Sequence, residues 1–123
     1  MYLVDTNILI YAGKGIEPYA SFLSKNVKRN QVSISAITVA EYFGGLKGSQ
    51  KSFNNLLEFI NTIDVDIEIA RIAGNYRKQS NKLKKVYLLD CIIAATAKQN
   101  NLILVTANSK DYSMKDIKVK TIV

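Results

Sequence analysis

The sequence of 123 residues contains no histidine and only one cysteine. Without histidine, neither a Ser-His-Asp nor a Cys-His catalytic arrangement can form, and a histidine-ligated zinc site is excluded as well. The single cysteine, Cys91, excludes an internal disulfide and a thiolate cage for zinc or an iron–sulfur cluster. We expect Cys91 to be a small core residue in a reducing compartment. Carboxylates are then the obvious groups for any chemistry at neutral pH, assisted by a metal ion or a lysine.

Long apolar runs are also missing. No stretch approaches the roughly 20 residues of a membrane-spanning helix, and the first residues lack the basic region and cleavage site of a secretory signal peptide. The sequence contains no internal repeat, low-complexity segment or linker between domains. We therefore expect a single cytoplasmic domain, spanning residues 1–123 and large enough for one core, with no membrane association.

The charge balance is basic, with 17 Lys and Arg against 10 Asp and Glu, a formal net charge of +7. Such an excess favours a polyanionic partner, nucleic acid first and an anionic membrane second, although basic proteins without such partners are common. Some of the charge clusters late in the sequence, at Arg77, Lys78, Lys82, Lys84 and Lys85. This cluster is either a helix end with a solvated turn or a rim that contacts phosphates.

Short apolar runs typical of strands alternate with segments of helical periodicity. The predicted strands are residues 2–4, 32–35, 63–65, 102–106 and 118–122. The predicted helices follow Asp5 and then span residues 17–26, 36–46, 52–61, 67–81 and 86–97. Strands that are separated by helices predict an α/β/α sandwich, with a central, mainly parallel sheet of four to five strands.

Three carboxylates stand in apolar surroundings. Asp5 ends the first strand, before Thr6 and Asn7, and all three residue types are favoured at helix N-caps. Glu41 shares a helix face with apolar and small residues, unless it is an ordinary solvated glutamate. Asp90 lies in VYLLDCIIAATA, residues 86–97, where it either caps the helix or needs donors, an opposite charge or a metal ion.

A parallel sheet would bring these acids together, because its ligands bind outside the C-terminal ends of the strands. Asp5 follows one strand, and Asp111 lies beyond the end of another. Clustered carboxylates repel one another unless a hard cation such as Mg²⁺ or Mn²⁺ neutralises them. Such an ion could activate water for displacement at a phosphodiester, while the positive surface holds the nucleic-acid backbone.

Four blocks of the sequence together resemble the PIN-domain nucleases, and within them the VapC-type toxin ribonucleases of toxin–antitoxin pairs. These blocks are LVDTNILI, TVAEYFGGL, YLLDCIIAATA and LVTANSKDY, in the order and approximate spacing of that family. By this resemblance the first three catalytic acids are Asp5, Glu41 and Asp90, which also hold the metal.

The fourth acid is less clear, because Asn108 occupies a position where some relatives have Asp. We assign the fourth catalytic role to Asp111, one turn later. The resemblance further gives Asn7, Thr106 and Asn108 supporting roles behind the metal ligands. If Asp111 points away, the site has three acids and holds a second metal ion only weakly.

The resemblance implies an endoribonuclease that depends on Mg²⁺ or Mn²⁺ and leaves a 5′-phosphate and a 3′-hydroxyl. It also implies an RNA substrate, a homodimer and a small cognate antitoxin that covers or enters the acidic pocket.

Other readings of the sequence compete with this one. A non-catalytic basic α/β module that binds nucleic acid would use the acids only as caps and surface charges, and a PIN-like nuclease could act on DNA. A haloacid-type phosphoryl-transfer site would need Asp where Asn7 stands, and a receiver-type domain would need a second acid beside Asp5. A P-loop is excluded, since residues 12–15 (AGKG) lack its spacing and its Ser or Thr.

Overall fold

The computed structural model describes residues 1–45, 50–80 and 87–122. Five strands form one sheet in the order β3-β2-β1-β4-β5, and every neighbouring pair is parallel. The strands are β1 (Tyr2–Val4), β2 (Val32–Ser35), β3 (Asn61–Ile63), β4 (Ile103–Val105) and β5 (Lys118–Lys120). The predicted parallel sheet is confirmed, with β5 at one edge as its alternating lysines favour.

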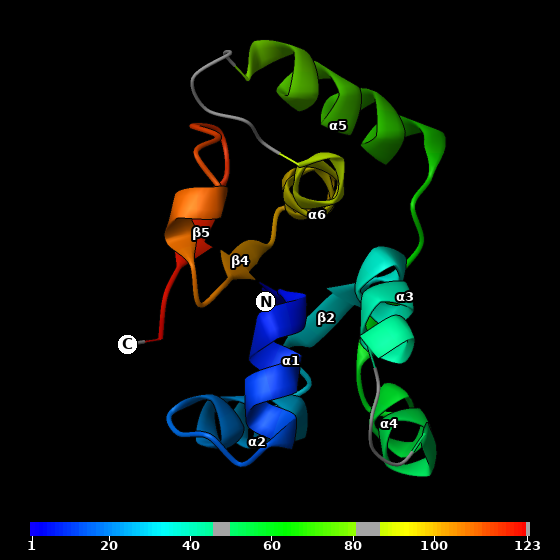
Figure 1. Ribbon diagram of the computed structural model, residues 1–123, viewed down its shortest axis with the longest axis vertical. Coiled ribbons are helices and arrows are strands. Elements are labelled where there is room, and N and C mark those ends of the chain that lie inside the picture. Colours follow the sequence, from blue (N-terminus) through cyan, green and yellow to red (C-terminus); the bar gives the residue numbers. More distant parts are fainter. Residues whose placement is uncertain (46–49, 81–86, 123) are drawn as a thin grey trace.

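Helices cover both faces of this sheet (Figure 1). They are α1 (Thr6–Gly13), α2 (Tyr19–Lys28), α3 (Ala36–Gly45), α4 (Gln50–Leu57), α5 (Ile67–Gln79) and α6 (Leu88–Gln99), with a 3₁₀ turn, η1 (Ser109–Asp111). In Figure 1, α5 and α6 lie above the strands, and α1 and α2 lie below them. The α/β/α architecture is therefore confirmed.

Two apolar cores, one on each face of the sheet, hold these layers together. Leu3 and Leu104 pack with α5 and α6, whereas Val4 and Val105 pack with the helices of the other layer. All four side chains are fully buried. Successive residues of a strand point to opposite faces, so β1 and β4 each contribute to both cores. Cys91 is buried in the first core, as predicted.

Some element boundaries differ from the prediction. The strand expected at residues 63–65 forms at Asn61–Ile63, because its pairing with buried β2 sets the register. The helix expected at residues 17–26 begins only at Tyr19, with Pro18 at its N-cap. The helix around Asp90 begins at Leu88, and the predicted start, Val86, lies outside the described residues.

Within the described ranges, no helix combines the length and the apolar character that crossing a membrane would require. The feature of the fold that matters most for the site is the C-terminal edge of the sheet. There β1 leads directly into α1, and β2 into α3. This edge therefore gathers side chains from segments that lie far apart in the sequence.

Candidate active site

Asp5 is the most constrained acid at this edge. It follows β1 and is the N-cap of α1, with extended backbone, and the residue is only 7% exposed. Its Oδ1 accepts a hydrogen bond of 2.7 Å from the Thr6 backbone N–H, and its Oδ2 accepts one of 3.0 Å from Thr106 Oγ1. Burial raises the pKa of Asp5, and these two hydrogen bonds oppose that rise. The carboxylate is thus held in one orientation at the end of the sheet.

A short chain of hydrogen bonds links Asp5 to Asp111. Thr106 is fully buried after β4, and its Oγ1 accepts a 3.1 Å bond from the Asn108 backbone N–H. The Asn108 side-chain amide then donates to Asp111 Oδ2 at 3.2 Å. Asp111 itself is exposed at the end of η1. The structure therefore places Thr106 and Asn108 directly behind two of the predicted acids.

Glu41 reaches the same edge from α3. Its Oε1 accepts a 2.8 Å hydrogen bond from Thr6 Oγ1, which also lies 3.4 Å from Thr38 Oγ1. Glu41 shares its helix face with the small residues Ala40 and Gly44, as expected, but all three are exposed, so this face is not buried. This face of α3 is left uncovered by the rest of the fold, and Thr6 orients the glutamate in place of packing.

Asp90 lies in the first turn of α6, where the helix dipole favours a negative charge. The hypothesis that Asp90 caps the helix is wrong, since Tyr87 is the N-cap and makes no side-chain capping bond. Burial, and then the negative charges of Asp5, Asp111 and Glu41, raise the pKa of Asp90 to about 6. The other three predicted acids therefore lie within electrostatic reach of Asp90.

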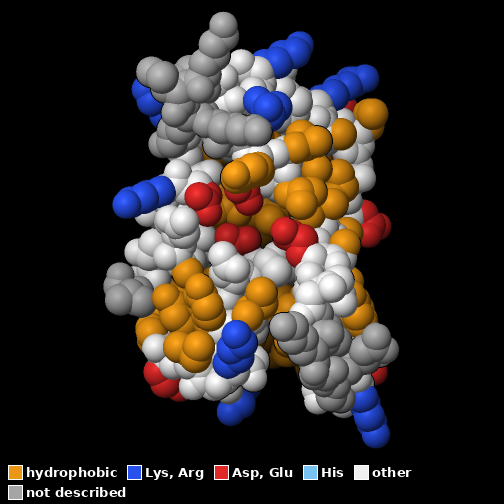
Figure 2. Space-filling model, in the orientation of Figure 1, with side chains coloured by type: hydrophobic (Ala, Val, Ile, Leu, Met, Phe, Trp, Pro, Cys, Tyr) orange, Lys and Arg blue, Asp and Glu red, His pale blue; other side chains and the backbone are white. Residues whose placement is uncertain are grey.

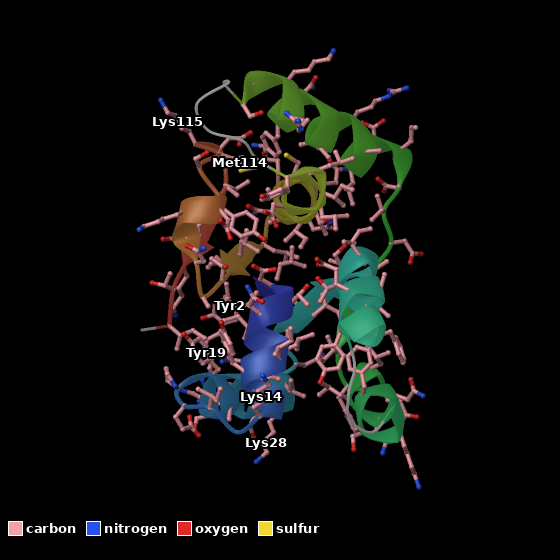
Figure 3. All side chains as sticks on the ribbon, viewed as in Figure 1. Tyr2, Lys14, Tyr19, Lys28, Met114 and Lys115 are labelled. Carbon is pink, nitrogen blue, oxygen red and sulfur yellow. The ribbon has the colours of Figure 1, made fainter. Side chains whose placement is uncertain are left out.

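Figure 2 shows acidic side chains gathered in a hollow at the middle of one face, bordered by apolar side chains, with Lys and Arg mainly towards its periphery. Of the predicted basic cluster, Arg77 and Lys78 are exposed at the end of α5. Lys82, Lys84 and Lys85 lie outside the described residues. Figure 3 places Lys14 and Lys28 towards the α2 end of the molecule and Lys115 towards the α5 end. Positive charge thus stands on both sides of the acidic centre.

Asn7 does not take part in the hydrogen bonds that hold the predicted acids. It is exposed in the first turn of α1, and its side chain forms no hydrogen bond with any described residue. The structure adds three residues to which the sequence pattern gave no role: Thr6, Thr38 and Tyr112. Thr6 lies inside the Asp-Thr-Asn triplet, and Tyr112 directly follows Asp111. For these two residues, the only signal in the sequence was that each is next to a predicted acid.

The donor set fits a hard divalent cation. The side chains at this edge offer carboxylate oxygens, and burial together with their mutual repulsion raises the pKa of Asp90. Over the described ranges, no three His, Cys, Asp or Glu side chains are already arranged to hold a metal ion. Mg²⁺ keeps several waters and takes only one or two carboxylates directly, so it does not need a closed protein cage.

Comparison with known proteins places this geometry in a family. The sequence pattern of the PIN domain matches residues 2–118. Ribonuclease VapC2 of Haemophilus influenzae is 30% identical over 118 residues, which cover 90% of this chain and 89% of that protein. Ribonuclease VapC10 of Mycobacterium tuberculosis is 31% identical over 119 residues, covering 93% and 87%.

A solved structure agrees with these relatives. The chain superposes with a TM-score of 0.84 on a chain of the toxin–antitoxin complex from Klebsiella pneumoniae. The two chains are 32% identical, and the match covers 98% of this chain and 97% of the other.

Proposed function

Because the chain belongs to the PIN-domain family, we propose that it is a metal-dependent endoribonuclease, the toxin of a toxin–antitoxin pair. One observation carries the proposal: carboxylates from the end of β1, from α3 and from η1 all raise the pKa of Asp90 on α6, at a single edge of the sheet. The names of the ribonuclease relatives support RNA over DNA as the substrate.

In this proposal Asp5, Glu41 and Asp90 hold Mg²⁺ or Mn²⁺, and Asp111 is the fourth catalytic acid. When bound, the ion supplies a water of lowered pKa and stabilises the charge that develops on the phosphate. Water attacks phosphorus in line with the O3′ leaving group, so the products are a 5′-phosphate and a 3′-hydroxyl.

The chain's own residues set the geometry of this step. Thr6 N–H and Thr106 Oγ1 fix the two oxygens of Asp5, so the carboxylate loses little conformational entropy when it binds. Thr6 Oγ1 orients Glu41, and the amide of Asn108 orients Asp111. Glu41 or Asp111, both exposed, then orients the attacking water and accepts its proton.

The partners follow the same reasoning. We propose a small antitoxin that covers the acidic hollow, supported by the Klebsiella pneumoniae toxin–antitoxin complex. A homodimer and a cytoplasmic site of action complete the proposal. Basic side chains at both ends of the molecule are suited to contact the RNA backbone on either side of the cut.

The test is cleavage of total RNA and of single-stranded DNA by purified protein, with Mg²⁺, with Mn²⁺ and with EDTA. We expect RNA to be cut only when metal is present. Glu41→Gln should reduce the rate at least a hundredfold, because it removes the charge but keeps the shape. Glu58→Gln, which changes an exposed glutamate after α4, is the matched control and should cleave at the wild-type rate. Full activity in EDTA would overturn the mechanism, and cleavage of DNA alone would overturn the substrate.

A further inference from the structure

The Tyr112 hydroxyl is a buried polar group to which no described residue is hydrogen-bonded. The residue is only 4% exposed, and among the described residues its Oη forms no hydrogen bond of normal geometry. An unpaired buried hydroxyl costs on the order of 1–3 kcal/mol, so proteins rarely retain one without a role. The ring alone would fill the core equally well, since it packs with the cluster around α5 and α6. The hydroxyl therefore needs an explanation that packing does not give.

The hydroxyl lies close enough to two of the acids, Asp5 and Asp90, to interact with both. Burial raises the pKa of Tyr112, and the charges of Asp5 and Asp90 raise it further, while Tyr112 in turn lowers the pKa of both carboxyls. The peptide after η1 sets this position: Tyr112 N–H donates to the Ser109 carbonyl at 3.1 Å. Figure 3 shows Met114, two residues later, close to α6.

The two carboxylates differ in how well they are already held. Asp5 accepts one hydrogen bond on each oxygen, from Thr6 and from Thr106. Over the ranges that the structure describes, Asp90 has no such anchor, and Tyr112 is the one side chain there that is placed to hydrogen-bond to it. The Tyr112 hydroxyl can donate only one hydrogen bond, and, among the described residues, Asp90 is the carboxylate that lacks a donor.

We propose that Tyr112 is a positioning residue, whose hydroxyl donates a hydrogen bond to the Asp90 carboxylate and turns it towards Asp5 when the cation binds. Without the cation, repulsion between the two carboxylates keeps Asp90 away from Asp5, which leaves the hydroxyl unpaired. The inference rests on the proposed function, since it assigns a role within the same metal site. Outer partners of this kind typically change metal affinity by 10–100-fold.

Tyr112→Phe tests the inference, because it removes only the hydroxyl and keeps the ring. Tyr76→Phe is the matched control: Tyr76 is also buried, but its hydroxyl donates to Asp116 at 2.8 Å, away from the four acids. Mn²⁺ binding is measured by calorimetry for wild type and both variants. We expect the Kd of Tyr112→Phe to rise about tenfold or more, and that of Tyr76→Phe to stay unchanged.

Melting in EDTA separates this role from a structural one. Tyr112→Phe should melt no lower than wild type, because it removes an unsatisfied group, whereas Tyr76→Phe should melt lower because it loses a hydrogen bond. RNA cleavage by Tyr112→Phe should recover towards the wild-type rate as Mn²⁺ is raised.

Three outcomes would overturn the inference. An unchanged Mn²⁺ affinity in Tyr112→Phe would do so while leaving the proposed nuclease intact. A clear loss of stability in EDTA would show that the hydroxyl has a structural partner. A wild-type protein that binds no Mn²⁺ and cuts no RNA would overturn both the inference and the proposed function.

Discussion

The Asp90 carboxylate lowers the stability of the metal-free protein, as expected for a residue placed for function. A half-buried carboxylate near three other acids is unfavourable for folding, and its pKa of about 6 lies well above the ordinary 3.8. The folded protein therefore binds a proton more tightly than the unfolded chain does. Stability from this group is fully present below about pH 4 and is lost as the pH rises towards 6. The metal-free protein carries this cost at neutral pH.

We accordingly expect Asp90→Asn to be more stable than wild type in EDTA at pH 7.5. The full shift would correspond to almost 3 kcal/mol, but solvent screening of a half-exposed group reduces the gain to about 1 kcal/mol. Denaturant unfolding at pH 7.5 and at pH 4 measures the difference, which should shrink at the lower pH. A variant that is less stable at both pH values would show that Asp90 is held by favourable contacts instead.

At the scale of the element, Asp5 combines two roles in one side chain. It ends β1 and caps α1 through Thr6 N–H, and it also presents its charge at the edge of the sheet. An asparagine caps a helix about as well as an aspartate, whereas alanine does not. The chain thus allows the structural role to be separated from the charge.

We expect Asp5→Asn to be at least as stable as wild type in EDTA, because it removes a buried charge, and to lose RNA cleavage. Asp5→Ala should lose cleavage too, but should also be destabilised by about 1 kcal/mol through the missing cap. Urea unfolding of both variants, with cleavage measured beside it, provides the comparison. Equal stability of the two variants would mean that the cap contributes nothing, and retained cleavage in Asp5→Asn would exclude this charge from catalysis.

The same scale shows what sequence could and could not predict. The Asp5 turn was predictable, because capping residues directly follow a short apolar strand. The register of β3 was not, since pairing with β2 rather than local hydrophobicity decides where an edge strand begins. Nor was the environment of Glu41: periodicity identifies a face of α3 but not whether another element covers it. The role of Tyr112 was not predictable either, because no sequence pattern marks a hydroxyl that lies near two carboxylates.

For the whole molecule, the parallel topology was the decisive inference. Once β1, β2 and β4 are parallel, the segments that leave their C-terminal ends must meet at one edge, whatever their separation in sequence. Thr106 lies 101 residues from Asp5, and its hydroxyl is nonetheless hydrogen-bonded to that carboxylate. Convergence of the acids was thus predictable from order and handedness, while their individual orientations required side-chain contacts.

The acids also come from both helix layers, since α3 packs in one core and α6 in the other. A cation held between them would therefore link the two halves of the molecule and favour the folded state alone. At a Mn²⁺ concentration 100 times the Kd, this linkage adds about 2.7 kcal/mol. For a domain of this size, that corresponds to a rise in Tm of roughly 10 °C.

We expect this rise when wild type is melted in EDTA and then in Mn²⁺ at neutral pH, and we expect Asp90→Asn to show little or none of it. Glu58→Gln should respond as wild type does, since its carboxylate lies outside the four acids. The two conditions should also invert the order of stability: Asp90→Asn melts above wild type without metal and below it with Mn²⁺. No inversion would mean that the acids at the sheet edge do not share a cation, because a merely structural effect of the substitution would act equally in both conditions.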